Sequence, residues 1–82
     1  MNVVKVNPIQ HLRLEVQFSD GLRGEVRFHE NHLYGVFEPL KNPEYFFKVN
    51  CDAGFVAWPG DIDLAPDAMY EEIKKNGSWE LN

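Results

Sequence analysis

The chain has 82 residues, of which 44% are hydrophobic, and this is enough apolar material for one small domain over residues 1–82. The composition excludes a disordered chain, and no apolar run approaches the ~20 residues that cross a bilayer, so we expect a cytoplasmic protein without a membrane segment. The single cysteine, Cys51, cannot form an internal disulfide, and the formal charge of −5 disfavours direct binding to nucleic acid.

The first part of the chain predicts three β-strands. Residues 3–6 form a short segment rich in β-branched side chains, which predicts a first strand. Asn7 and Pro8 are expected to end this strand. Residues 12–18 and 22–28 alternate between apolar and polar side chains, which is typical of strands with one buried face. We therefore expect an N-terminal strand followed by a hairpin.

The loop of this hairpin follows from keeping the apolar residues on one face. A two-residue loop would put Phe18 opposite Arg23 and would mix the two faces. A three-residue loop at residues 19–21 puts Phe18 opposite Leu22 instead. It also places Gly21 at the left-handed position that such a loop requires. The sequence therefore predicts both the length of the loop and the register of the hairpin.

This register carries an electrostatic cost on the polar face of the hairpin. Arg13 lies opposite Arg27, and Glu15 lies opposite Glu25, and like charges in such positions are mildly unfavourable. We expect diagonal contacts between Arg13 and Glu25, and between Glu15 and Arg27, to offset this cost.

The middle of the chain predicts an extended segment and a short helix. Pro39 is expected to keep Glu38 extended, because the residue before a proline avoids the helical region. Asn42 followed by Pro43 is typical of a helix start, where asparagine caps the helix and proline occupies its first position. A short helix is therefore expected from Pro43 onward.

A second hairpin and a longer helix complete the predicted fold. Residues 47–50 and 55–58 are expected to form the hairpin strands, and residues 66–75 a helix that ends before Gly77. Residues 76–82 are expected to be a C-terminal tail. The predicted fold class is α+β: a small antiparallel sheet, made of two hairpins and an N-terminal strand, packed against a short helix and a C-terminal helix.

The large apolar side chains are expected to form a single core. Gly24 leaves a gap on the apolar face of the hairpin, and a large ring such as that of Trp58 could fill it. The residues expected to contribute to this core are Phe18, Val26, Phe46, Trp58 and Tyr70.

Few residues have the pattern of a catalytic or metal site. His29 and His32 lie three residues apart, but a closed zinc site needs four ligands and the sequence offers no second pair, so we expect no metal. Cys51 precedes Asp52, whose charge raises a thiol pKa rather than lowering it. We therefore expect a protein that is not an enzyme and that binds no cofactor.

Acidic residues are concentrated in the second half of the chain. Residues 42–82 carry the entire excess of −5, and residues 61–72 contain five acids and no base. These acids either solvate the start of a helix or steer a basic partner toward the protein. The candidate interaction surface consists of Asp61, Asp63, Asp67, Glu71 and Glu72.

An ordered set of short motifs resembles a known bacterial family. The set comprises Phe18-Ser19-Asp20-Gly21, Phe37-x-Pro39-Leu40, Pro43-x-x-Phe46, Trp58-Pro59 and Asp63-Leu64-Ala65-Pro66-Asp67-x-x-Tyr70. Over residues 3–72 the chain is similar to the bacterial domain-of-unknown-function family numbered two-four-four-two. The resemblance implies a small α+β fold and, for some members, the antitoxin role in a toxin–antitoxin pair. It implies no catalytic residues, because none is established for the family.

Together these observations favour a small, non-catalytic protein-interaction module that is antitoxin-like. The expected partner is a small basic protein from a neighbouring gene, and the sequence also allows a homodimer. The alternative is a small-ligand-binding sensor or accessory domain, for which Trp58 is the candidate aromatic contact. Gene neighbourhood, copurification with a basic protein, or a ligand bound near Trp58 would discriminate between these functions.

Overall fold

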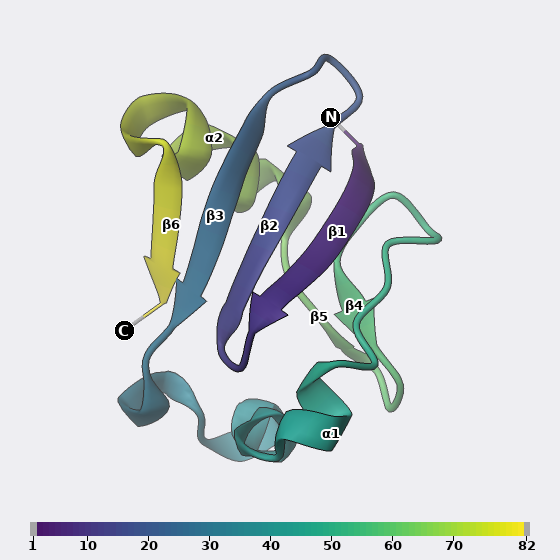
Figure 1. The fold of residues 1–82 in the computed structure, drawn as a ribbon, viewed down its shortest axis with the longest axis vertical. Coiled ribbons are helices and arrows are strands. Elements are labelled where there is room, and N and C mark those ends of the chain that lie inside the picture. The colour runs from purple at the N-terminus through teal and green to yellow at the C-terminus, as the bar shows by residue number, and fades with distance from the viewer. Residues whose placement is uncertain (1, 82) are drawn as a thin grey trace.

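The computed structural model of the chain describes residues 2–81 (Figure 1). Within these residues the strands are β1 (Val3–Gln10), β2 (Arg13–Phe18), β3 (Arg23–Phe28), β4 (Ala57–Trp58), β5 (Ile62–Asp63) and β6 (Ser78–Leu81). The helical segments are the 3-10 helices η1 (Glu30–His32) and η2 (Gly35–Lys41) and the α-helices α1 (Pro43–Phe46) and α2 (Pro66–Asn76). None of the described helices has the length and apolar character needed to cross a bilayer.

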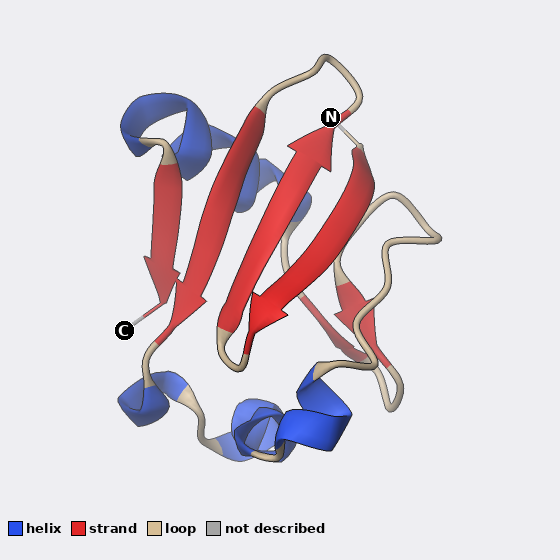
Figure 2. Cartoon of the chain, viewed as in Figure 1, coloured by secondary structure: helices blue, strands red, loops and turns tan. Residues whose placement is uncertain are grey.

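A four-stranded sheet in the order β1-β2-β3-β6 forms the centre of the fold. The pairs β1–β2 and β2–β3 are antiparallel, whereas β6 lies parallel to β3, so the sheet is mixed. Figure 2 shows α2 behind this sheet and the other helical segments below it, while the front face is not covered by a helix. β4 and β5 form a separate antiparallel pair. The α+β class is confirmed, but the expected purely antiparallel sheet is not what forms.

The first hairpin has the predicted loop and register. The Phe18 amide donates to the Leu22 carbonyl at 2.8 Å, which closes a loop of residues 19–21. Leu14 lies opposite Val26 in the ladder, as the burial argument requires. Gly21 has φ of 93°, a left-handed conformation that favours glycine.

Replacing Gly21 with valine is expected to lower the free energy of unfolding by about 1 kcal/mol or more. A Cβ at this position would meet nothing within 4 Å, so the effect comes from backbone strain and not from a clash. Gly21→Asn is the matched control, because asparagine tolerates the left-handed region better than a β-branched residue. Chemical denaturation of both variants checks this, and a Gly21→Val protein as stable as the parent would contradict it.

The polar face of the hairpin carries a three-residue ion network. Arg13 lies opposite Arg27, and both guanidinium groups bond Glu25 Oε1, at 2.8 Å and 2.6 Å from their Nε atoms. The predicted diagonal contact between Arg13 and Glu25 is therefore confirmed. The predicted contact between Glu15 and Arg27 is wrong, because Arg27 pairs with Glu25 on its own strand.

β1 is longer than the sequence predicts. It continues through Asn7 and Pro8 to Gln10, and Pro8 lies opposite Leu14 of β2. β1 is an edge strand, where the missing N–H of a proline can face away from the ladder, so Pro8 does not end it.

The segment before α1 is helical, so the expectation that Pro39 keeps Glu38 extended is wrong. Both residues belong to η2, which also carries Leu40 into the core. The carbonyl of Leu40 accepts a hydrogen bond from His11 Nε2 at 2.9 Å. Burying a leucine side chain contributes about 1.5–3 kcal/mol, which outweighs the local preference of the residue before proline.

The expected second hairpin is mostly absent from the described residues. Only one bridge forms between its two predicted strands, and it joins Asn50 to Ala57. β4 pairs with β5 instead, which buries Ile62 and brings the Leu64 amide to the Val56 carbonyl at 2.9 Å. The β4–β5 pairing adds the buried side chains of Ile62 and Leu64 to the core, which favours it.

Both predicted helices are present with their expected end signals. Asn42 Oδ1 accepts the Glu44 amide at 3.0 Å, and Pro43 is the first residue of α1. At the end of α2, Gly77 has φ of 81° and donates its N–H to Ile73 at 2.7 Å.

Residues 76–82 do not form the expected tail within the part of the chain that is described. After Gly77 turns the chain, residues 78–81 form β6, with Trp79 opposite Val26 and Leu81 opposite Phe28. These two β6 side chains pack against the core, which gives the strand its place beside β3.

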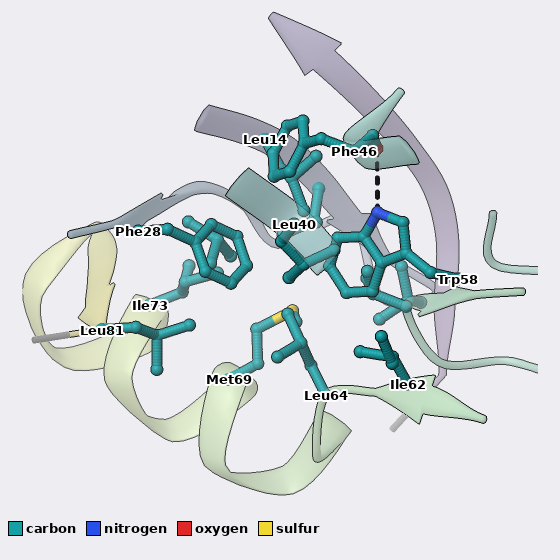
Figure 3. Close-up of a cluster of buried hydrophobic side chains, with 14 of the residues drawn as sticks. Leu14, Phe28, Leu40, Phe46, Trp58, Ile62, Leu64, Met69, Ile73 and Leu81 are labelled. Carbon is teal, nitrogen blue, oxygen red and sulfur yellow. Dashed lines mark hydrogen bonds between the residues drawn. The ribbon is translucent and has the colours of Figure 1, made fainter. Parts of the chain in front are cut away.

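The core lies between the rear face of the sheet, the α-helices and the β4–β5 pair. Phe18, Val26, Phe46 and Trp58 are buried, and Tyr70 packs against them while partly exposed, so the predicted core is confirmed. Figure 3 shows aromatic rings and aliphatic side chains from sheet and helices meeting in this cluster. Such contacts tie residues far apart in the sequence into one unit.

Candidate functional site

Asp61 and Asp63 lie at the β4–β5 hairpin, and both are exposed. Asp61 occupies the turn with φ of 67°, and Asp63 lies opposite Ala57. Figure 1 places this hairpin and the C-terminal end of α2 on opposite sides of the molecule. The acidic run at residues 61–72 therefore extends across the protein and does not fold into one compact patch.

The acids of α2 fall on different sides of the helix. Asp67 and Glu71 are one turn apart and exposed, on the side away from the buried residues of the helix. Glu72 is partly exposed and accepts a hydrogen bond from Asn76 Nδ2 at 2.9 Å. Glu72 also borders a hollow between α2 and β6. The structure thus brings Asp67 and Glu71 together and directs Glu72 elsewhere.

Ion pairs within residues 2–81 engage two of the acids. Glu25 pairs with Arg13 and Arg27, and Glu80 lies 3.1 Å from His29 Nε2. None of the candidate acids has a basic partner among the described residues: Asp61, Asp63, Asp67, Glu71 and Glu72. Their charges are therefore available to a partner molecule.

The uncovered face of the four-stranded sheet, which we call the open face, holds half of the basic residues. The ladder registers put its charged side chains on the same side of the sheet. These side chains are Lys5, Arg13, Glu15, Arg23, Glu25, Arg27 and Glu80. The open face carries a formal +1, which leaves −6 for the remainder of a chain whose total is −5. Charge is thus segregated by face as well as by sequence.

Part of this separation of charge between the faces could be predicted from the sequence. The alternation in residues 12–18 and 22–28 predicts which arginines share a face. The position of Lys5 could not be predicted this way, because β1 changes register between Val3 and Lys5.

The open face also has a hollow of about 410 Å³, bordered by Lys5, Val6, Asn7, Glu15, Val16, Gln17 and Arg23.

Trp58 belongs to the core, which removes it as the candidate aromatic beside a ligand. Its side chain is 3% exposed, and its indole N–H donates to the Phe46 carbonyl at 2.8 Å (Figure 3). The gap at Gly24 is filled by Ile73 of α2 and not by Trp58: a Cβ added at Gly24 would lie 2.4 Å from Ile73 Cγ2. The expected filling of this gap by Trp58 is therefore wrong.

The hairpin loop is joined to α2 by a polar contact. The Tyr70 hydroxyl donates to Asp20 Oδ2 at 2.6 Å, and the Leu22 amide donates to Asp20 Oδ1 at 3.0 Å. The bond from Tyr70 and then that from Leu22 lower the pKa of Asp20 below its ordinary value. The ring of Tyr70 also packs at 90° on Phe18, and Lys74 Nζ lies 5.9 Å from it. This contact fixes the loop against the helix.

The Tyr70→Phe variant is expected to raise the pKa of Asp20 toward 3.8, because it removes the largest cause of the lowering. A folded-state pKa below the unfolded one adds stability that is present above the unfolded pKa and is lost as pH falls through the folded value. The variant should therefore lose less stability on acidification than the parent. Carboxyl-carbon NMR titration checks this, and an unchanged pKa of Asp20 would show that the hydroxyl is not the cause.

The described residues contain no group of three or more histidine, cysteine or acidic side chains that could hold a metal ion. The side chain of His32, named in the sequence analysis, lies outside the described part. The pKa of the partly buried Cys51 thiol is raised, first by burial and then by Asp52, as the sequence predicts. A raised pKa leaves less of the nucleophilic thiolate at neutral pH.

A comparison with protein-family models shows which family the chain belongs to. A family model described as "Protein of unknown function (DUF2442)" matches residues 3–75. The chain belongs to the DUF2442 family. The matched region of this DUF2442 domain includes β1 to β5 and nearly all of α2, and it ends before β6. No match was found among curated proteins or among solved structures.

Proposed function

We propose that this DUF2442 domain is a non-catalytic protein-interaction module that binds a small basic protein through its acidic side chains. The observation that carries the proposal is the set of exposed carboxylates without ion-pair partners in the described chain. Asp67 and Glu71 lie one turn apart on the same exposed side of α2. Unpaired charges of one sign raise the association rate with a partner of opposite sign.

The resemblance to a family with antitoxin-like members supports a partner encoded by the neighbouring gene. In this proposal the domain is the antitoxin-like member of the pair and acts in the cytoplasm. Its overall negative charge suits a basic partner and opposes direct contact with phosphate backbones. The open face, which carries a formal +1, gives an internal control for the role of charge.

Two carboxylates with shifted pKa values, Asp20 and Glu25, have structural partners and are poor candidates for general acids. The pKa of Glu25 is lowered by its hydrogen bonds from Arg27 and then from Arg13, against the effect of burial. The shift at Asp20 comes from the Tyr70 and Leu22 hydrogen bonds. Both carboxylates are held in their charged form by structural contacts, whereas a general acid needs a raised pKa.

Coexpression with the protein encoded by the neighbouring gene tests the proposal. We expect the two proteins to copurify as a stoichiometric complex, and titration calorimetry of the separated proteins should show saturable binding. A neighbouring protein that stays separate during purification and gives no heat of binding at about 100 µM would overturn the proposal.

A second candidate function, the binding of a small anionic ligand, is favoured by the hollow on the open face. Lys5 and Arg23 border this hollow, outnumber the one carboxylate there, that of Glu15, and have no ion-pair partner within the described residues. Asn7 and Gln17 add amide groups at the same place. Thermal unfolding with inorganic phosphate tests it: stabilisation that is lost in Lys5→Gln and Arg23→Gln would favour this function over the first.

A further inference from the structure

The two edges of the four-stranded sheet differ in how they are covered. At the β1 edge, the Val3 amide donates to the Gly54 carbonyl at 2.8 Å. Pro8 on the same strand has no N–H to offer. Covering segments and prolines are common ways to stop an edge strand from pairing with another chain. β1 is therefore covered at Val3, and Pro8 offers no N–H to an added strand.

The β6 edge has unpaired backbone groups. The His29 amide donates to the Leu81 carbonyl at 3.0 Å, so the backbone groups of Leu81 face β3. Backbone groups of successive strand residues point to alternate edges, so Trp79 also faces β3 while Ser78 and Glu80 face away. Among residues 2–81, no backbone hydrogen bond is made by the outward groups of Ser78 or Glu80.

An acidic hollow adjoins this open edge. It measures about 240 Å³ and is bordered by Glu72, Asn76, Ser78, Trp79 and Glu80. Glu72 accepts a hydrogen bond from an amide and Glu80 contacts a histidine, but neither carboxylate pairs with lysine or arginine in the described chain. The partly buried ring of Trp79 supplies an aromatic surface in the same place. Side chains alternate along β6, so the Trp79 ring lies on the same side as α2 and Glu72, while Glu80 lies on the open face opposite Arg27. The Glu72 carboxylate and the indole ring favour a basic side chain on the α2 side of the edge.

We propose that β6 accepts an extended basic segment of the partner protein by strand addition. The inference rests on the proposed function and names its mode of binding. The outward N–H and C=O groups of Ser78 and Glu80 would bond the added strand, and one lysine or arginine of that strand would enter the hollow. A second copy of this chain fits less well, because pairing two β6 strands would bring Glu72 and Glu80 of both copies together.

A synthetic eight-residue peptide of alternating lysine and valine is the probe, and a glutamate–valine peptide of the same length is its control. On the intact protein, we expect the lysine peptide to slow amide hydrogen exchange at Ser78 and Glu80 about tenfold at saturation. The amides of Trp79 and Leu81 already face β3 and should change little. The acidic peptide should leave all four amides unchanged.

A pair of variants distinguishes the contribution of the outward N–H of residue 80 from that of the Glu80 carboxylate. Glu80→Pro removes an outward N–H without removing a bond to β3, and Glu80→Ala removes the same carboxylate but keeps that N–H. We expect the lysine peptide to bind Glu80→Pro about tenfold more weakly than Glu80→Ala. If Glu80→Pro fails to fold, the exchange pattern of the parent protein decides the question.

Three results would overturn strand addition at β6. They are no binding of the lysine peptide at about 1 mM, protection of amides elsewhere than β6, and equal affinity of the proline and alanine variants. A fourth result, a dimer that sedimentation detects for the parent protein and not for Glu80→Pro, would overturn it as well. None of these results bears on copurification with the neighbouring protein, so failure of this inference and failure of the proposed function are distinguishable.

Discussion

The Trp58→Ala variant is expected to lose about 3–5 kcal/mol of unfolding free energy, a large share of the 5–15 kcal/mol typical of a folded domain. The ring is 3% exposed and lies 5.9 Å, centroid to centroid, from both Phe28 and Phe46. Its removal leaves a cavity and also leaves the Phe46 carbonyl without its indole partner. Denaturant unfolding measures the loss.

Two control variants show whether the loss of stability comes from removing a buried ring. Trp58→Phe keeps most of the ring and loses the N–H, so it should fall between the parent and the alanine variant. Phe47→Ala removes an aromatic side chain that is 46% exposed, and it should cost much less. A Trp58→Ala protein with the stability of the parent would mean that the indole is not part of the core.

The Gly24→Val variant is expected to lower the free energy of unfolding by about 2–3 kcal/mol through overpacking. A Cβ at Gly24 would lie 2.4 Å from Ile73 Cγ2 and 2.9 Å from the Gly77 carbonyl oxygen. The Ile73 side chain can be trimmed, but the Gly77 contact is with backbone at the turn between α2 and β6. Valine here should therefore push α2 away from the sheet.

A double-mutant cycle tests the assigned cause. If Ile73 occupies the gap at Gly24, the combination of Gly24→Val with Ile73→Ala should be more stable than the sum of the single changes predicts. Additive losses, or a Gly24→Val protein that unfolds like the parent, would contradict the packing of Ile73 against Gly24. Urea denaturation of the four proteins gives all the terms of the cycle.

The first hairpin and both α-helices could be predicted because their signals are local. The alternation of apolar residues, with Gly21 at a loop position, determines one register, and Asn42 and Gly77 mark the ends of helices. The same reasoning failed for β6, whose four residues are too few for a clear periodicity. Its parallel pairing with β3 joins segments about 50 residues apart, and no local signal specifies such a contact.

The pairing of β4 was mispredicted because a short apolar segment can pair with the segment before it or the segment after it.

The residues of the candidate site were predicted, but their arrangement in space was not. Exposure of Asp61, Asp63, Asp67 and Glu71 agrees with the charge pattern, yet their distribution over a hairpin and a helix depends on the tertiary fold. The role of Trp58 was ambiguous for a similar reason, since an aromatic residue in sequence can serve a core or a ligand equally well.

The association rate with the neighbouring-gene protein, measured on two matched charge variants, tests the central claim most directly. One variant carries Asp67→Asn and Glu71→Gln on α2, and the other carries Arg13→Gln and Arg23→Gln on the open face. At low salt we expect about a tenfold slower association for the α2 variant and an equal or faster one for the open-face variant. The difference should shrink at high salt, because exposed charges are screened beyond about 8 Å at physiological ionic strength. Equal rates for the α2 variant and the parent at both salt concentrations would contradict a partner-binding role for the acidic side chains.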